Sequence, residues 1–143
     1  MKINFVLLLI LVTLFVSCQK GYKQAYKTFE DFNKSNERNK GWFPTIIYTD
    51  AIDLQNISYL DPLCAFGKFT YTKSGPYDSI FSITPKINFE SFNDKTNQNI
   101  KRKPSWFPDL TNFDKSDIDV IKQERFYILK NRKDKKIYFI LSN

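Results

Sequence analysis

The sequence has no histidine, and this absence excludes much common enzyme chemistry. Ser-His-Asp and Cys-His catalysis need an imidazole base, and the usual zinc sites contain one. A catalytic acid or base would have to be a carboxylate, Tyr or Lys. No catalytic motif built from those groups is present, so we expect a protein that is not an enzyme and that carries no cofactor or metal ion.

Cysteine is also scarce, because only Cys18 and Cys64 are present. Cys64 lies in the apolar stretch Pro62-Leu63-Cys64-Ala65-Phe66, which predicts a buried free thiol. Arginine is scarce as well: the net charge of +7 comes mainly from lysine. Phosphate recognition favours the bidentate guanidinium, and no nucleic-acid module is present. We therefore expect no nucleic-acid partner.

The first stretch of the chain is the longest apolar run. Lys2 precedes residues 5–16, an apolar run interrupted only by Thr13, which is the layout of a secretory signal. A helix that crosses a bilayer needs about 20 apolar residues. The run is therefore too short to span a membrane and predicts an export signal.

The signal closes on Leu14-Phe15-Val16-Ser17-Cys18, which resembles the lipobox of bacterial lipoproteins. That family usually has Leu three residues before the cysteine and Ala or Ser two residues before it, where Phe15 and Val16 stand here. The resemblance implies cleavage before Cys18 and attachment of acyl chains such as palmitate to its sulfur. The protein would then be held at the periplasmic face of the cell envelope. An ordinary cleaved signal and an uncleaved N-terminal anchor are the alternatives.

Three segments follow from this interpretation: a signal peptide over 1–17, a tether over 18–27 and one globular domain over 28–143. The fold class predicted is α+β. A mainly antiparallel sheet from the 46–72 region and a C-terminal hairpin would pack on one or two short helices, after the N-terminal signal helix. Helices are predicted over 29–35 and 117–123, and strands over 66–72 and 80–83, with hairpin strands over 125–130 and 136–141. A bulge or turn is predicted near 55–56, and turns at 61–62 and 73–76. The polar segment 90–103 is predicted to be a long exposed loop with at most a helical turn.

A second resemblance covers about a quarter of the chain. Gly41-Trp42-Phe43-Pro44, followed by Ile46-Ile47, Ala51, Asp53, Leu60-Asp61 and Phe66-Gly67-Lys68-Phe69, is similar to a Gly-Trp-x-Pro motif of small uncharacterised exported bacterial proteins. The resemblance implies no catalytic residue.

The candidate recognition surface consists of four aromatic rings: Trp42, Phe43, Trp106 and Phe107. Exposed aromatic rings stack on sugars or anchor peptides, but the same rings commonly pack in a core.

An EF-hand calcium-binding loop that starts at Asn112 is excluded, because Asp117 and Gln123 occupy the positions that need Gly and Glu. Asp50, Asp53 and Asp61 are the carboxylates available for a hydrolase.

The function predicted is that of a lipid-anchored exported module. It would contact the membrane through acyl chains on Cys18 and bind a protein or an envelope glycan without catalysis. A small carboxylate-dependent hydrolase is one alternative. An immunity or inhibitor protein that acts against a secreted enzyme is the other.

Overall fold

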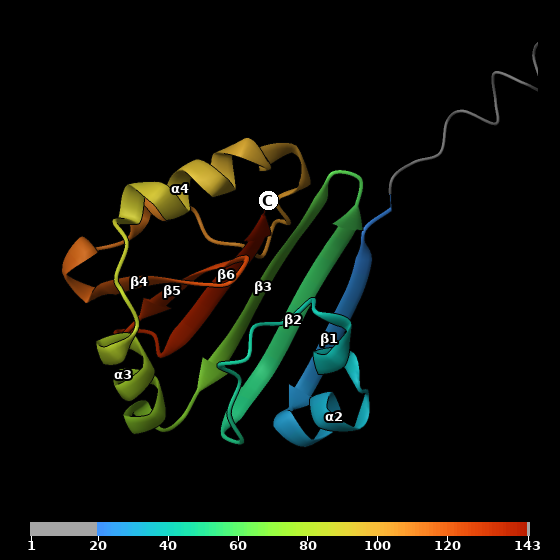
Figure 1. The fold of residues 1–143 in the computed structure, drawn as a ribbon, viewed down its shortest axis with the longest axis horizontal. Helices are drawn as coiled ribbons and strands as arrows, with labels where there is room; N and C mark the ends of the chain where they lie inside the picture. Colours follow the sequence, from blue (N-terminus) through green and yellow to red (C-terminus); the bar gives the residue numbers. More distant parts are fainter. Residues whose placement is uncertain (1–19, 143) are drawn as a thin grey trace, which may run out of the picture.

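The computed structural model describes residues 20–142, so the signal segment and Cys18 lie outside the described residues (Figure 1). One six-stranded antiparallel sheet with the order β1-β2-β3-β6-β5-β4 forms the centre of the fold. Its strands are β1 (Tyr22–Thr28), β2 (Ala51–Leu60), β3 (Leu63–Tyr71), β4 (Ile118–Gln123), β5 (Phe126–Asn131) and β6 (Lys136–Ser142). Between residues 20 and 142, no helix is both long and apolar enough to cross a bilayer.

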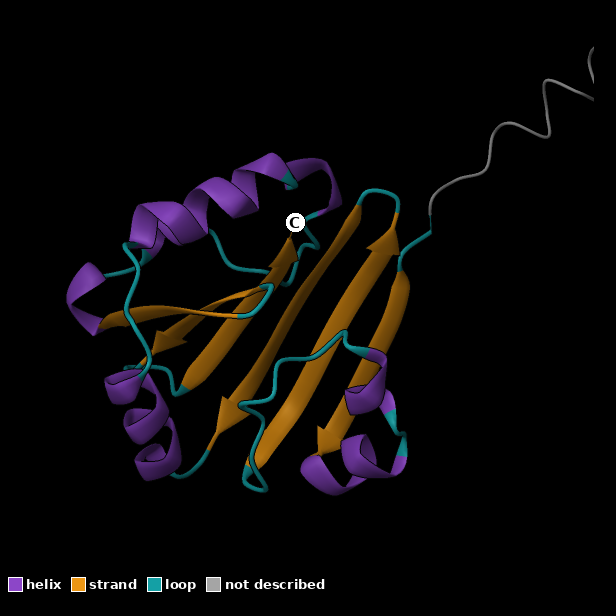
Figure 2. Ribbon diagram, in the orientation of Figure 1, coloured by secondary structure: helices purple, strands orange, loops and turns teal. Residues whose placement is uncertain are grey.

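Among the described residues, three α-helices pack on the sheet: α2 (Phe29–Lys34), α3 (Ser74–Ile83) and α4 (Phe89–Gln98). The same part of the chain contains four short 3-10 turns: η1 (Glu37–Lys40), η2 (Ile100–Arg102), η3 (Leu110–Asn112) and η4 (Lys115–Asp117). Figure 2 shows α2 beside β1 and β2, with α3 and α4 toward the β4 edge. The predicted α+β class, with a mainly antiparallel sheet, a C-terminal hairpin and short helices, is confirmed.

Both faces of the sheet bury apolar side chains, because successive residues of a strand point to opposite sides. On the first face, Phe32 of α2 and Tyr77 of α3 join Phe69 and Phe139 in one core cluster. On the second face, Phe92 of α4 joins a separate cluster. Since α4 contacts β4, β5 and β6, the second face is covered over only part of its width.

The β2–β3 pair carries the irregularity predicted from the sequence, although two residues earlier. The pairing register shifts between Ile52 and Gln55, and Asp53 adopts a left-handed φ of 51°. An extra residue in one strand re-aims the side chains that follow it. The turn predicted at Asp61-Pro62 joins the two strands and contains a cis peptide bond.

Several local predictions are confirmed. The first predicted helix corresponds to α2, and the side chain of its N-cap Thr28 accepts a hydrogen bond from the Asp31 N–H, as the capping pattern indicated. The predicted hairpin corresponds to β5 and β6. Cys64 is fully buried, and this burial raises the pKa of its thiol, so the side chain packs as a small apolar group.

The predicted tether over 18–27 is corrected from Tyr22 onward, because those residues form the edge strand β1. The sequence of this segment is too polar to predict a strand. The buried polar side chain of this strand is Gln24. Its amide group donates a hydrogen bond to the Glu37 carboxylate and accepts one from the Asn56 amide. The folded domain therefore begins before Thr28.

The turn predicted over 73–76 and the strand predicted over 80–83 are wrong, because residues 74–83 form α3 and Lys73 precedes it as the N-cap. Pro76 fits there because the N–H groups of a first helical turn have no partner within the helix. Tyr77 and Phe81, four residues apart, are the buried side chains of this helix.

The loop expected over 90–103 contains α4. Asn88 caps this helix by accepting a hydrogen bond from the Ser91 N–H at 2.9 Å, and Phe92 and Thr96 face inward. The segment has few strong helix formers, so its helical state depends on this cap and on packing rather than on propensity.

The helix expected over 117–123 is also wrong, because this segment is strand β4. The Ser116–Asp119 spacing resembles a helix cap, but Asp119 instead contacts cations on other elements. Val120 and Ile121 suit a strand, where β-branched side chains pack well.

Candidate functional site

The four aromatic residues singled out in the sequence do not form one surface. Phe43 lies in the cluster on the first face of the sheet and Phe107 in the cluster on the second, and both are almost fully buried. This corrects their assignment to a recognition surface: both are core residues. Trp42 and Trp106 are half-buried and lie beside two different hollows.

Asp50 and Asp61, two of the three carboxylates considered for hydrolysis, do not converge. Asp50 and Asp61 precede and follow the ten-residue strand β2, which separates them by roughly 30 Å at the usual rise per residue. Asp50 already accepts hydrogen bonds from the Thr72 and Lys73 N–H groups and from the Tyr77 hydroxyl. Its role is therefore to join the start of β2 to the end of β3.

The acidic residues near 114–119 are used in the same structural way. Asp114 accepts hydrogen bonds from the backbone N–H and hydroxyl of Ser116, and these bonds lower the pKa of its carboxyl. Among residues 20–142, no group of three Cys, Asp or Glu side chains is placed to hold a metal ion.

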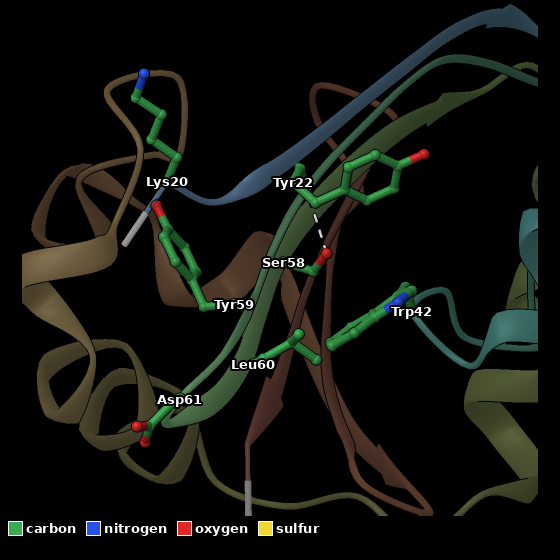
Figure 3. A pocket seen from close by; sticks show the side chains of 7 residues that line it. All are labelled: Lys20, Tyr22, Trp42, Ser58, Tyr59, Leu60 and Asp61. Carbon is green, nitrogen blue, oxygen red and sulfur yellow. Dashed lines mark hydrogen bonds between the residues drawn. The ribbon is translucent and has the colours of Figure 1, made fainter. Parts of the chain in front are cut away.

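A hollow lies where the chain enters the sheet, at the start of β1 and the end of β2. We call it the aromatic hollow; it has a volume of about 370 Å³ and is lined by Lys20, Tyr22, Trp42, Ser58, Tyr59, Leu60 and Asp61. Figure 3 shows Tyr22, Trp42, Ser58 and Leu60 on one side of β2, and Lys20 and Tyr59 on the other. Leu60 is 81% exposed and Tyr22 is 54% exposed, so the rim of the hollow is apolar and open.

A buried polar network supports this hollow. The Glu37 carboxylate accepts hydrogen bonds from Gln24 Nε2 at 2.6 Å and from Lys40 Nζ at 2.6 Å. Asn56 Nδ2 donates to Gln24 Oε1 at 2.8 Å, which links η1, β1 and β2. The hydrogen bond with Glu37 raises the pKa of Lys40, so its ammonium group stays charged. The network fixes β1 against the segment that carries Trp42.

A second hollow crosses the part of the sheet that α4 leaves uncovered. It consists of three adjoining depressions of about 150, 200 and 240 Å³: Gln55 lines all three, and Ala25 and Asp53 each line two of them. We call their union the lysine trough. Its lining includes the charged residues Lys23, Lys27, Asp53, Lys68 and Lys136 and the aromatic residue Trp106.

The trough is strongly cationic. Four lysines stand against the single carboxylate of Asp53, and within residues 20–142 no ion pair is formed by any of these lysines. Lys68 Nζ lies 5.4 Å from the centre of the Trp106 ring. Burial and the neighbouring Lys136 charge lower the pKa of Lys68, partly offset by Asp53. An anion placed there would relieve this repulsion.

Sequence reasoning identified Trp106 but missed the lysines of β1. Lys23 and Lys27 flank Ala25 on one side of the strand, and all three are exposed. This alternation of lysine with a small residue was the sequence pattern that could have indicated the trough. It did not indicate a site, because only the position of α4 determines which part of the sheet stays open.

Residues 21–70, about a third of the chain, match the family model of the YbbD head domain. The matched part begins at the start of β1 and ends within β3. It contributes Tyr22, Trp42 and Leu60 to the aromatic hollow and Lys23, Lys27 and Lys68 to the lysine trough. No curated protein and no solved structure matches the chain.

Proposed function

We propose that the protein is an exported, lipid-tethered and non-catalytic binding module, and that its lysine trough binds an anionic envelope glycan. The signal segment and the lipobox-like Cys18 support the export and the tether. The match to the YbbD head domain is compatible with this assignment without naming a ligand.

The observation that carries the glycan assignment is the group of lysines that lines this open trough of the sheet. Lys23, Lys68 and Lys136 line the trough, and none of them forms an ion pair with a carboxylate in the described part of the chain. Gln55 adds an amide group, and Trp106 an aromatic ring, at the same surface. Lysine binds anions as a point charge, amides pair with hydroxyl groups, and aromatic rings provide apolar area with fixed geometry. Together these groups suit a chain of acidic sugars.

The test uses purified protein and a sized polyuronate, with neutral dextran as the uncharged comparison. The variant Lys23→Gln/Lys68→Gln removes two trough charges. We expect its affinity for the polyuronate to fall about tenfold at low salt, because two charge-assisted contacts are lost. Isothermal titration calorimetry measures the change, and the affinity of the unmodified protein should also fall as salt is added.

A matched control carries Lys34→Gln/Lys101→Gln, which changes the net charge equally at exposed positions outside the trough. This control should bind as the unmodified protein does. Equal weakening by both variants would mean that only net charge matters and would contradict the trough assignment. Polyglutamate bound as tightly as the polyuronate would contradict the choice of glycan over acidic peptide.

The tether makes a separate prediction. In the producing bacterium, Cys18→Ser should move the protein from the membrane fraction to the soluble fraction, because two acyl chains anchor firmly and none remain. Detergent phase partitioning and mass spectrometry of the mature N-terminus measure this. Cys64→Ala is the control and should stay with the membrane, since Cys64 is buried in the fold. A mature chain that begins at any residue other than Cys18 would contradict the proposed lipid tether.

A further inference from the structure

The aromatic hollow lies close to the proposed point of lipid attachment. Cys18 precedes Tyr22 by four residues, and an extended chain spans at most about 3.4 Å per residue. The start of β1 is therefore within about 14 Å of the lipidated residue. If acyl chains on Cys18 lie in a bilayer, this end of the sheet is held at the bilayer surface.

The side chains at this end have the composition of a membrane interface. Trp42 and Tyr22 combine an apolar ring with a polar group, and Leu60 projects at the β2–β3 turn with 81% of its surface exposed. Trp and Tyr gather at the headgroup level of bilayers. Lys20 adds a cation and an apolar stem beside them, which suits a headgroup layer that carries phosphate.

Rigid support distinguishes this rim from a scattered set of exposed residues. Ser58 Oγ donates to the Tyr22 carbonyl oxygen at 3.5 Å (Figure 3). The Glu37 network holds β1 against the segment that carries Trp42. Ile83, by contrast, is 76% exposed at the end of α3, which follows the opposite end of β3 (Figure 1). Tyr22, Leu60 and the partly exposed ring of Trp42 thus lie together at the end of the sheet where β1 begins and β2 ends.

We propose that the rim of the aromatic hollow, formed by Tyr22, Trp42 and Leu60, inserts into the headgroup layer of the membrane that holds the acyl chains. This inference rests on the proposed lipid tether. It gives the domain a defined orientation: β1 begins at the bilayer and runs away from it, so the lysine trough faces the space beside the membrane.

The experiment uses purified lipidated protein in phosphatidylcholine vesicles, with Trp106→Phe so that Trp42 is the remaining tryptophan. Lipids brominated in the upper acyl chain should quench Trp42 emission by about half, because interfacial side chains reach roughly 5–10 Å into the boundary of headgroups and acyl chains. Adding Leu60→Asn should reduce this quenching at least about twofold, while the matched variant Ile83→Asn should leave it unchanged.

The outcomes separate the inference from the tether. Protein that floats with the vesicles but shows no quenching of Trp42 would overturn the inserted rim and leave the tether standing. Equal quenching in the Leu60→Asn and Ile83→Asn variants would overturn it too. Protein that fails to float with the vesicles would overturn the tether and, with it, this inference.

Discussion

Replacing Gly67 with alanine should lower the free energy of unfolding by about 3 kcal/mol, since overpacking a tight core forces side chains and backbone to shift. Gly67 lies in β3 opposite Phe139 of β6, and the Phe139 ring covers it. A Cβ atom at this position would sit 1.9 Å from Phe139 Cζ. Phe139 is fully buried in the first-face cluster, so its ring has no free space to enter.

Urea unfolding followed by tryptophan emission measures the effect, with Gly75→Ala as the matched control. Apart from its chain neighbours and the backbone of its own helix, no atom lies within 4 Å of a Cβ built on Gly75, which is in the first turn of α3. That change should alter the stability by less than about 1 kcal/mol, because the unfolded-state entropy that alanine removes is offset by crowding between its Cβ and the ring of Pro76. Comparable stability of the two variants would refute the packing of the Phe139 ring over Gly67.

The double variant Gly67→Ala/Phe139→Leu provides a second check. Removing the ring relieves the clash, so the cost of the two changes together should be smaller than the sum of the single costs by about 1 kcal/mol or more. Additive costs would show that alanine at position 67 acts through something other than the ring.

The elements predicted correctly are those whose local pattern and tertiary role agree. The β5–β6 hairpin has two β-rich runs separated by a polar turn, and both strands are central in the sheet. The helix after Thr28 has its cap and its buried Phe32 within a few residues. Because their local conformational preference agrees with their tertiary packing, such segments can be predicted from the sequence.

The elements missed are those stabilised by partners that are distant along the chain. The polar strand β1 is kept in the sheet through Gln24, whose partners Glu37 and Asn56 are 13 and 32 residues away. Helix α4 is weak in propensity and is stabilised by burying Phe92 under the second face. No short window of sequence contains this information.

The candidate sites show the same limit. Trp42 and Trp106 were recognisable as surface candidates by residue type, but their neighbours were not. The aromatic hollow joins Tyr22, Trp42 and Leu60 from three segments, and the lysine trough joins β1 to the start of β6. Which of these side chains stay exposed depends on what α4 and η1 cover, and that is decided only by tertiary packing.

Asp119 shows most clearly how a tertiary contact overrides a local pattern. Its carboxylate receives Lys86 Nζ at 2.8 Å, Arg132 Nη1 at 2.6 Å and Lys130 Nζ at 3.6 Å. Lys130 is only 3% exposed and also contacts Asp78 at 2.8 Å. This ion network joins β4 and β5 to α3.

Asp119→Ala should lower the free energy of unfolding at pH 7 by about 3 kcal/mol, because it leaves the buried Lys130 charge with less compensation. Glu30→Ala is the control: it breaks the Glu30–Lys34 pair, in which both side chains are more than 70% exposed, and should cost less than about 0.5 kcal/mol. Urea unfolding at fixed pH compares the two. Equal small losses would contradict a stabilising role for the network.

The pH dependence of this difference has a definite sign. Burial alone would raise the pKa of Asp119, but the hydrogen bond from Lys86 and the charges of Arg132 and Lys130 outweigh it and lower the pKa below its ordinary value of 3.8. A carboxyl whose pKa is lower in the folded state stabilises that state above its unfolded pKa, and this contribution is lost as the pH falls through the folded pKa. The stability gap between unmodified protein and Asp119→Ala should therefore be constant near neutral pH and shrink only below about pH 4. A gap that closes between pH 5 and pH 7 would instead assign the effect to a different titrating group.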